Sequence, residues 1–364
     1  MKKIAFLISD RSIYSAGIKP FVDIGHGLYK LGIAPSFYAL NIKKGISSNL
    51  SNMYPHLNLI NVNTIDEIIK NIETSSVELI ISDDFLPRLN ILHEIKRETG
   101  IKMASYAQIF YGLNTLNKSS KKSLKYWLGS MVPWSMLTNK YCNTLSSMDF
   151  VIGNSYATSY VLNLFYSVYT SGVVYPPVGV NFEQIEKPKI NKKEGLLVYL
   201  GHYPDYYLRD MPYTINQLSK SISKIKIWTG NPENLKWLKP NVEVYTDISD
   251  KEVMDLYQSS EAVYIPTAFE SFGYVGPEAL LFDTPVLLDT YQPWLEGFPM
   301  DSNAVKILDP KDKSIEPFLE FLKSSKDVST ARQYIERRYS AIQSAKDLLY
   351  IINKNRINGG FQYG

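Results

Sequence analysis

The chain has 364 residues, of which 45% are hydrophobic and 21% charged, and this length exceeds what one hydrophobic core usually serves, so we expect a globular protein of two domains. The formal net charge of +3 is too small to indicate a nucleic-acid partner, and no stretch is long and apolar enough to span a bilayer. The single cysteine, Cys142, excludes an internal disulfide framework and a zinc cluster of thiolates, and it favours a reducing, cytoplasmic setting.

In the first half of the chain, short apolar runs alternate with helical patterns. Residues 2–9 are interpreted as a first strand, not a signal peptide, because no small-residue cleavage site follows. A helix is expected from Pro20 to about residue 32, and another over 86–100. The remaining predicted strands are 35–41, 77–83, 101–108, 149–155 (followed by a helix) and 171–177. This alternation is typical of a parallel sheet covered on both faces.

Residues 177–194 are charged, contain prolines and lack periodicity, which indicates a linker, and the alternation then starts afresh. A helix is predicted over 249–260 and one or two helices over 332–355. The predicted strands of the second half are 196–202, 224–230, 242–247, 262–267 and 285–289. The fold class is therefore α/β, with two Rossmann-like doubly wound domains. Ligands of such sheets bind at the carboxyl ends of the strands, so we expect the site in a cleft between the domains.

Two glutamates, Glu270 and Glu278, flank a glycine-bearing turn after the predicted strand 262–267. Glycine lets the backbone approach a ligand closely, and the start of the following helix presents unpaired N–H groups that suit a diphosphate. The two carboxylates can accept hydrogen bonds from the hydroxyls of ribose and sugar on either side of that diphosphate. The alternative is a helix-capping glutamate and a surface glutamate that bind no ligand.

The block from Glu270 to Glu278, followed by Asp-Thr-Pro-Val at 283–286, resembles the E-x7-E motif of the retaining glycosyltransferases of family 4. Three more segments extend the resemblance: YPPVGVNF at 175–182, GNSYATSYVLNLF at 153–165 and the glycine-bearing stretch 15–32. The resemblance implies the GT-B fold, two Rossmann-like domains facing a central cleft. It implies an acceptor-side domain at 1–180, a donor-binding domain at 181–335 and a C-terminal helix at 336–364 that crosses back to the first domain.

By the same resemblance, Glu278 binds the ribose, Glu270 the donor sugar, and the backbone amides near residues 272–274 the phosphates. A base is usually read by backbone groups near the ends of the strands 224–230 and 242–247. We assign catalytic roles to Glu270 and Arg209, donor binding to Glu278, Phe272, Gly273, Tyr274, His202, Gly17 and Gly230, and acceptor-side contacts to Tyr106, Gln108 and Asp83.

The chain departs from the family pattern at two places. After the strand 196–201 the family has an arginine and then a lysine directed at the diphosphate, where this chain has His202 and then Arg209. Near the end of the strand 101–108 many relatives have a histidine, where this chain offers Tyr106 and Gln108. These departures concern how charge on the leaving group is neutralised and how the acceptor or the donor sugar is contacted.

Several candidates also have purely structural interpretations. Arg209 could be a solvated charge at a helix start, and His202 a structural side chain. Gly17 could serve only the turn after the first strand, and Asp83 a helix cap.

The segment 117–137 combines four lysines with a Leu, Trp and Met stripe at helical spacing. A basic helix with an aromatic stripe can lie on an anionic membrane surface. The same stripe can pack into the core of the first domain. Peripheral membrane contact is therefore one of two interpretations.

The sequence thus predicts an enzyme that transfers a sugar from a nucleotide-diphosphate sugar to a hydroxyl acceptor, either a glycan, a lipid-linked acceptor or another, with retention of anomeric configuration. We expect no cofactor and no metal. The alternatives are a nucleotide-sugar epimerase of the same fold and a catalytically inactive nucleotide-sugar-binding protein. A dinucleotide oxidoreductase is disfavoured because no G-x-G-x-x-G follows the first strand.

Overall fold

The computed structural model describes residues 3–9, 18–42, 54–108, 134–183, 185–186, 193–201, 209–235, 242–268 and 270–357. Two predicted site residues, Gly17 and His202, lie outside these residues, as does most of the segment 117–137. The described chain divides into two compact units, Met1–Pro177 with Tyr339–Gly364 and Val178–Arg338.

The first unit is built on a parallel seven-stranded sheet in the order β3-β2-β1-β4-β5-β6-β7. Its strands are β1 (Lys3–Ser9), β2 (Ser36–Leu40), β3 (Asn58–Val62), β4 (Val77–Asp83), β5 (Lys102–Ala107), β6 (Phe150–Gly153) and β7 (Gly172–Val173). Its helices are α1 (Lys19–Lys30), α3 (Ile65–Ser75), α4 (Leu86–Thr99), α7 (Trp134–Ser146), α8 (Tyr156–Tyr166) and α14 (Ala341–Ile357). The central strands are buried on both faces, as their continuous apolar runs predict.

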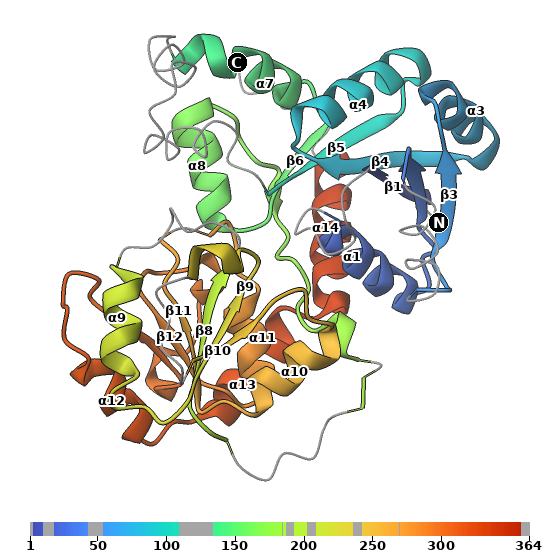
Figure 1. Cartoon of the computed structure of the whole chain (residues 1–364). Helices are drawn as coiled ribbons and strands as arrows, with labels where there is room; N and C mark the ends of the chain where they lie inside the picture. The colour runs from blue at the N-terminus through green and yellow to red at the C-terminus, as the bar shows by residue number, and fades with distance from the viewer. Residues whose placement is uncertain are drawn as a thin grey trace. The chain divides into compact units, whose positions relative to one another are not determined.

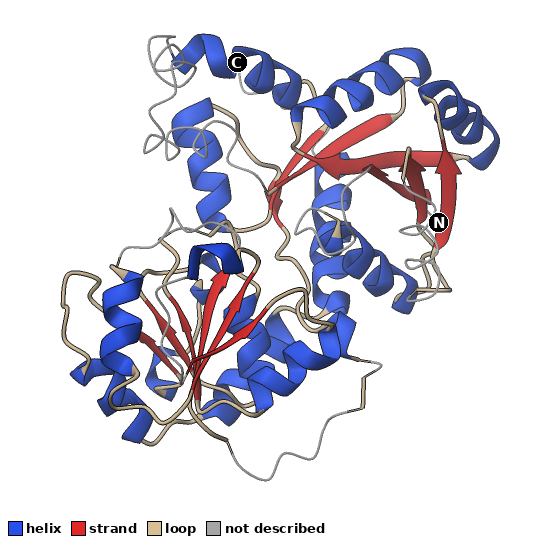
Figure 2. Cartoon of the chain, in the orientation of Figure 1, coloured by secondary structure: helices blue, strands red, loops and turns tan. Residues whose placement is uncertain are grey.

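The second unit has a parallel six-stranded sheet in the order β10-β9-β8-β11-β12-β13. Its strands are β8 (Leu196–Gly201), β9 (Ile225–Thr229), β10 (Val242–Tyr245), β11 (Ala262–Ile265), β12 (Val286–Leu288) and β13 (Val305–Ile307). Its helices are α9 (Met211–Leu218), α10 (Asp250–Gln258), α11 (Val275–Leu281), α12 (Glu316–Lys323) and α13 (Val328–Arg338). Within each unit, the strands lie between helices (Figure 2).

These sheets confirm the predicted fold class of two Rossmann-like doubly wound α/β units. The sequence interpretation missed the edge strands β3 and β13. Most residues of β3 are exposed or only partly buried, and β13 has only three residues, so neither strand gives a continuous apolar run. The predicted C-terminal helical stretch forms two helices, α13 and α14, which are separated by Tyr339 and Ser340.

Helix α14 packs closely on α1 within the first unit (Figure 1). A Cβ atom added to Gly27 of α1 would lie 1.9 Å from the carbonyl oxygen of Ala341, so only glycine permits this approach. Ser344 of α14 also donates a hydrogen bond of 2.7 Å to the Tyr175 carbonyl. The last described helix is therefore an integral layer of the first unit.

In each sheet, successive strands of the chain are added first on one side of the first strand and then on its other side, so each sheet has one topological switch point. In the first unit this switch point lies between β1 and β4, and in the second between β8 and β11. The loops that leave neighbouring strands there run to opposite faces and open a crevice at the carboxyl ends, where doubly wound sheets bind their ligands. The segments after β4 and β11 are therefore the first places to look for a site.

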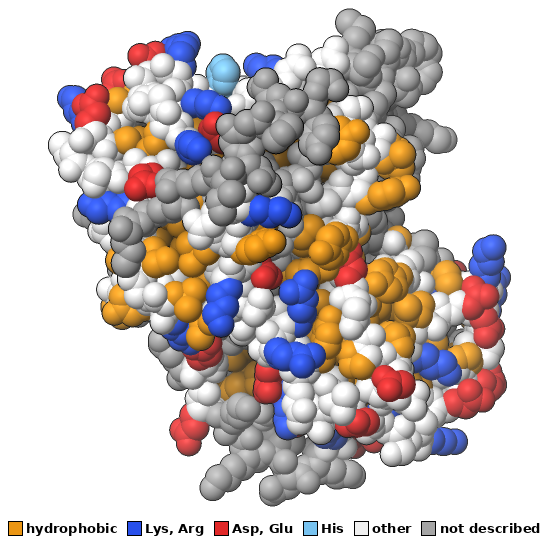
Figure 3. Space-filling view, turned by 180° about the vertical axis from the view of Figure 1, so that it is seen from behind, with side chains coloured by type: hydrophobic (Ala, Val, Ile, Leu, Met, Phe, Trp, Pro, Cys, Tyr) orange, Lys and Arg blue, Asp and Glu red, His pale blue; other side chains and the backbone are white. Residues whose placement is uncertain are grey.

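Acidic and basic side chains lie interspersed among apolar and other side chains on the face of the molecule in Figure 3. The side chains coloured there form no extended basic stretch. No helix in the described ranges combines the length and the apolar character that crossing a membrane requires.

Candidate functional site

Glu270 follows β11 at the switch point of the second sheet and is half-buried. Within the described chain its carboxylate has no hydrogen-bond or ion-pair partner, and burial alone raises its pKa to about 7. It does not cap α11, which begins after Tyr274 without any side-chain cap bond. A buried carboxylate without a protein partner is costly, so it is a candidate to meet a ligand.

Glu278 lies inside α11, with seven residues between it and Glu270, and its side chain is buried. The hydroxyl of Tyr257 in α10 donates a hydrogen bond of 3.2 Å to its carboxylate. Burial and the neighbouring Glu278 hold the pKa of Tyr257 well above its usual range, so the phenol stays a donor. The structural alternative of a capping glutamate and a surface glutamate thus fits neither residue.

The glycines of the turn have a packing role that the sequence interpretation did not anticipate. Gly273 has a positive φ of 87°, and a Cβ there would lie 2.5 Å from the Gln292 side-chain oxygen. A Cβ on Gly276 would lie 2.5 Å from the Trp294 ring. The backbone of this turn therefore lies directly against Gln292 and Trp294, and a side chain at either glycine would push it away.

Two further predicted donor residues, Phe272 and Tyr274, lie in the same turn. Phe272 is buried at 2% exposure, and its ring lies 5.4 Å from that of Tyr274, centroid to centroid. Gly230 directly follows β9, and its N–H donates a hydrogen bond of 2.9 Å to the Gly201 carbonyl at the end of β8. All three lie at the carboxyl edge of the second sheet.

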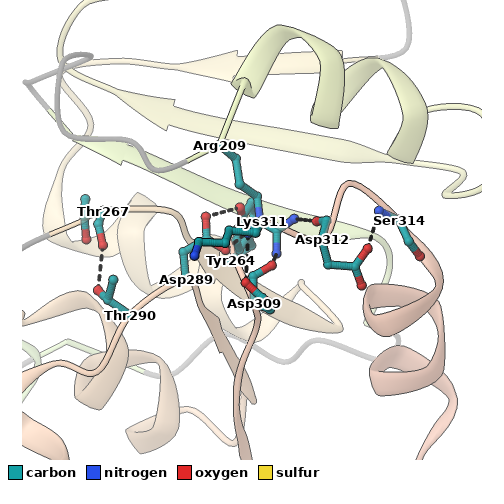
Figure 4. A network of polar contacts seen from close by, with 9 residues as sticks. All are labelled: Arg209, Tyr264, Thr267, Asp289, Thr290, Asp309, Lys311, Asp312 and Ser314. Carbon is teal, nitrogen blue, oxygen red and sulfur yellow. Dashed lines mark hydrogen bonds and ion pairs between the residues drawn. The ribbon is translucent and has the colours of Figure 1, made fainter.

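Arg209 is neither solvated nor free, because its side chain is 6% exposed and its Nε donates a hydrogen bond of 2.8 Å to Asp289. The other guanidinium nitrogens donate to the carbonyls of Asp309 and Asp312 (Figure 4). The guanidinium also lies over the Phe318 ring. The interpretation of Arg209 as a solvated charge is therefore wrong. A phosphate contact by Arg209 would come in addition to these bonds or in place of them.

The acceptor-side candidates lie at the carboxyl edge of the first sheet, and two of them are engaged within the protein. Asp83 is buried and forms a two-point ion pair with Arg88, while its carboxylate also accepts from the Phe85 N–H. The Tyr106 hydroxyl donates a hydrogen bond of 2.8 Å to the Val174 carbonyl, and burial raises its pKa well above the usual range. These contacts explain why both side chains face inward.

Gln108, the third acceptor-side candidate, is connected to the neighbouring Asp84. The Gln108 N–H donates to one oxygen of the Asp84 carboxylate at 3.0 Å, and the Tyr141 hydroxyl donates to the other at 2.9 Å. Asp84 therefore secures the backbone where β5 ends.

The structure brings Glu270, Phe272, Gly273, Tyr274 and Glu278 into one turn and helix start. The sequence interpretation missed the residues that support this turn, namely Tyr257, Thr267, Asp289, Gln292 and Trp294. The available signal was the stretch DTYQPWLEG, which places a tryptophan six positions after the buried strand β12. Over the described ranges, no three His, Cys, Asp or Glu side chains come together as a metal-binding group.

No protein-family model matches the chain, and no curated protein sequence matches it. Solved structures of GT-B glycosyltransferases match it over almost its whole length, which shows that the fold is GT-B. A glycosyltransferase from Rickettsia africae has a TM-score of 0.72 at 12% identity, covering 98% of this chain and 99% of that one. Sucrose-phosphate synthase from Thermosynechococcus elongatus has a TM-score of 0.69 at 12% identity, with 98% and 100% covered.

A protein described as a UDP-N-acetylglucosamine 2-epimerase from Listeria monocytogenes is also similar. Its TM-score is 0.63 at 12% identity, covering 99% of this chain and 98% of that one. At this level of identity the likeness shows the fold alone.

Proposed function

We propose that the protein is a glycosyltransferase that moves a sugar from a nucleotide-diphosphate sugar to a hydroxyl acceptor, with retention of the anomeric configuration. The observation that carries the proposal is the half-buried Glu270 carboxylate at the switch point of the second sheet, which has no partner among the described residues and is separated by seven residues from the buried Glu278. Two carboxylates in this arrangement suit a ligand that offers hydroxyls on both sides of a diphosphate.

In this proposal Glu278 accepts hydrogen bonds from the ribose and Glu270 from the donor sugar. The backbone amides near residues 272–274 contact the phosphates, and Arg209 supplies positive charge at the same edge of the sheet. Stabilising negative charge on the departing diphosphate lowers the barrier to breaking the glycosidic bond. Glu270 positions the sugar and is not assigned as a nucleophile.

Retention without a protein nucleophile places the acceptor hydroxyl on the same face of the sugar as the departing phosphate. A phosphate oxygen then takes the proton of the acceptor as the new bond forms. The proposal uses no bound metal ion, so a chelator is expected to leave the transfer rate unchanged.

The glycosyltransferases among the structural neighbours support this proposal at the level of fold. The neighbour described as an epimerase favours a second candidate, a nucleotide-sugar epimerase. An epimerase converts its nucleotide sugar when no acceptor is present, whereas a transferase needs a hydroxyl acceptor or, slowly, water.

The test is a panel of UDP-, GDP-, ADP- and TDP-linked hexoses, screened first for thermal stabilisation, since a ligand that binds only the folded state raises Tm. The stabilising donor is then incubated with the protein alone and with acceptor hydroxyl compounds. Transfer or slow hydrolysis with retained configuration supports the proposal. Epimerised donor supports the second candidate, binding without turnover indicates an inactive binding protein, and no stabilisation by any donor overturns all three.

A further inference from the structure

Residues 289–294 follow β12. The polar side chains of this segment that face inward form hydrogen bonds with neighbouring parts of the protein. Asp289 accepts hydrogen bonds of 2.8 Å from both Arg209 and the Tyr264 hydroxyl. The Thr290 hydroxyl donates a bond of 3.0 Å to the Thr267 carbonyl (Figure 4). The segment is therefore held against the end of β11, the strand from which the Glu270 turn departs.

Gln292 joins this segment to its neighbours through both ends of its amide. Its nitrogen donates to the Thr267 hydroxyl at 3.2 Å, and its oxygen accepts from the Trp294 indole N–H at 2.7 Å. The residue is 1% exposed. A buried amide in two directed bonds has one orientation, so it fixes the position of the Trp294 ring.

Trp294 in turn forms the surface on which the turn rests. Its side chain is fully buried, and three of its ring atoms lie 2.5 to 2.9 Å from the place where a Gly276 Cβ would be. The Gln292 oxygen occupies the equivalent position beside Gly273. Close packing of this kind transmits small displacements, because the interior has no free volume to absorb them.

We propose that Gln292 and Trp294 are positioning residues that set the backbone of the 270–276 turn, and through it the Glu270 carboxylate. Neither needs to contact the donor. The inference about the backbone stands on the contacts above, and its consequence for turnover rests on the proposed function.

The first experiment needs no ligand. Amide hydrogen exchange is measured by mass spectrometry on the full chain, comparing wild type with Gln292→Met, which keeps the side-chain length and removes both bonds. Exchange in the peptide covering 270–276 is expected to rise about tenfold, the effect of losing about 1.4 kcal/mol of local stability, while peptides from β8 and β11 keep wild-type rates.

The matched control is Gln217→Met on α9, a helix that ends near the amino ends of the strands, away from the 270–276 turn. This variant is expected to leave all of these exchange rates unchanged. Unchanged exchange at 270–276 in Gln292→Met overturns the proposal. Raised exchange throughout the second unit overturns it as well, because that pattern indicates a general loss of stability.

The second experiment uses size compensation. Gly276→Ala alone places a methyl group against the Trp294 ring, whereas Trp294→Phe vacates the ring atoms that this methyl would strike. The double variant Gly276→Ala/Trp294→Phe is therefore expected to show slower exchange at 270–276 than Gly276→Ala, and simple additivity of the two effects contradicts a direct contact.

For function, the same variants are assayed with the donor that the panel identifies. Gln292→Met is expected to lower kcat about tenfold with KM within about twofold, because Glu270 acts on the sugar and Glu278 still binds the ribose. Equal loss in both Gln292→Met and Gln217→Met counts against the positioning role. If no donor binds wild type, the proposed function fails while the exchange result still decides the structural inference.

Discussion

Both sheets carry acidic side chains at the carboxyl ends of the strands beside their switch points, yet the two regions treat these groups differently. In the first unit, Asp83 and Asp84 are buried and bonded to Arg88, Tyr141 and backbone N–H groups. In the second unit, Glu270 has no partner within the described residues and its pKa rises to about 7. The same topological position thus serves stability in one unit and remains available for a ligand in the other.

The contrast teaches how to separate structural from functional acids at a ligand-binding edge. A carboxylate whose lone pairs are satisfied by fixed donors holds the backbone, and displacing those donors costs free energy. A carboxylate that is buried without donors costs free energy until a ligand supplies them.

Arg88→Ala is expected to destabilise the protein by about 3–5 kcal/mol, because it leaves Asp83 charged and buried without its partner. Urea denaturation measures the change. The control is Arg97→Ala on the same helix, whose ion pair with Glu98 is exposed and is expected to contribute less than about 1 kcal/mol. If both variants lost a similarly small amount of unfolding free energy, the Asp83–Arg88 ion pair would not be needed for stability.

Glu270→Ala is expected to reduce turnover by about 100-fold with a smaller effect on donor affinity, since its interaction with the sugar strengthens as the bond breaks. Steady-state kinetics with the donor found in the panel measure it. Glu320→Ala, at an exposed acid on α12, is the matched control. Wild-type kcat in Glu270→Ala contradicts the assignment.

Glu278→Ala is expected to weaken donor binding about tenfold while changing kcat little, as the loss of a charged hydrogen-bond acceptor implies. Tyr257→Phe removes one hydrogen-bond donor to that carboxylate and is expected to weaken binding about threefold. Calorimetry with the donor measures both, and Tyr213→Phe on the exposed side of α9 provides the control. A larger effect from Tyr257→Phe than from Glu278→Ala would reverse the assigned roles.

The raised pKa of Glu270 predicts a pH-dependent cost to stability. The folded-state pKa of about 7 lies above the usual value of 4.5, so the folded state binds its proton more tightly. The contribution of Glu270 to the free energy of unfolding is therefore fully present below pH 4.5 and is lost as the pH rises through about 7. Glu270→Gln has no such loss, so it is expected to exceed wild type by about 3 kcal/mol at pH 8 and nearly to match it at pH 4.5.

Denaturant titrations of both proteins at the two pH values make the comparison. Equal stability of wild type and Glu270→Gln at pH 8 would mean that the carboxylate is solvated or paired. The ionised form of Glu270 is also the form that accepts hydrogen bonds from sugar hydroxyls. We therefore expect kcat/KM to rise with pH through about 7.

The predictability of the fold follows from its strand patterns. Runs such as 79–81 and 262–265 are apolar on both faces, which only a strand covered by two layers accommodates, so the two doubly wound sheets could be predicted. Edge strands were missed because β3 and β13 bury too little surface to show an apolar run. The spacing and type of the residues from Glu270 to Glu278 likewise predicted where the candidate site lies.

Local residue order determined the alternation of strands and helices, the turn between two glutamates and the charges available near it, because each depends on neighbours within a few positions. Only the tertiary structure decided which carboxylates are satisfied. Asp83 meets Arg88 on the next helix, Arg209 meets Asp289 eighty residues away, and Glu270 meets no such donor in the part of the chain that the structure describes. Pairing of buried charges depends on distances across the fold, and sequence spacing does not encode those distances.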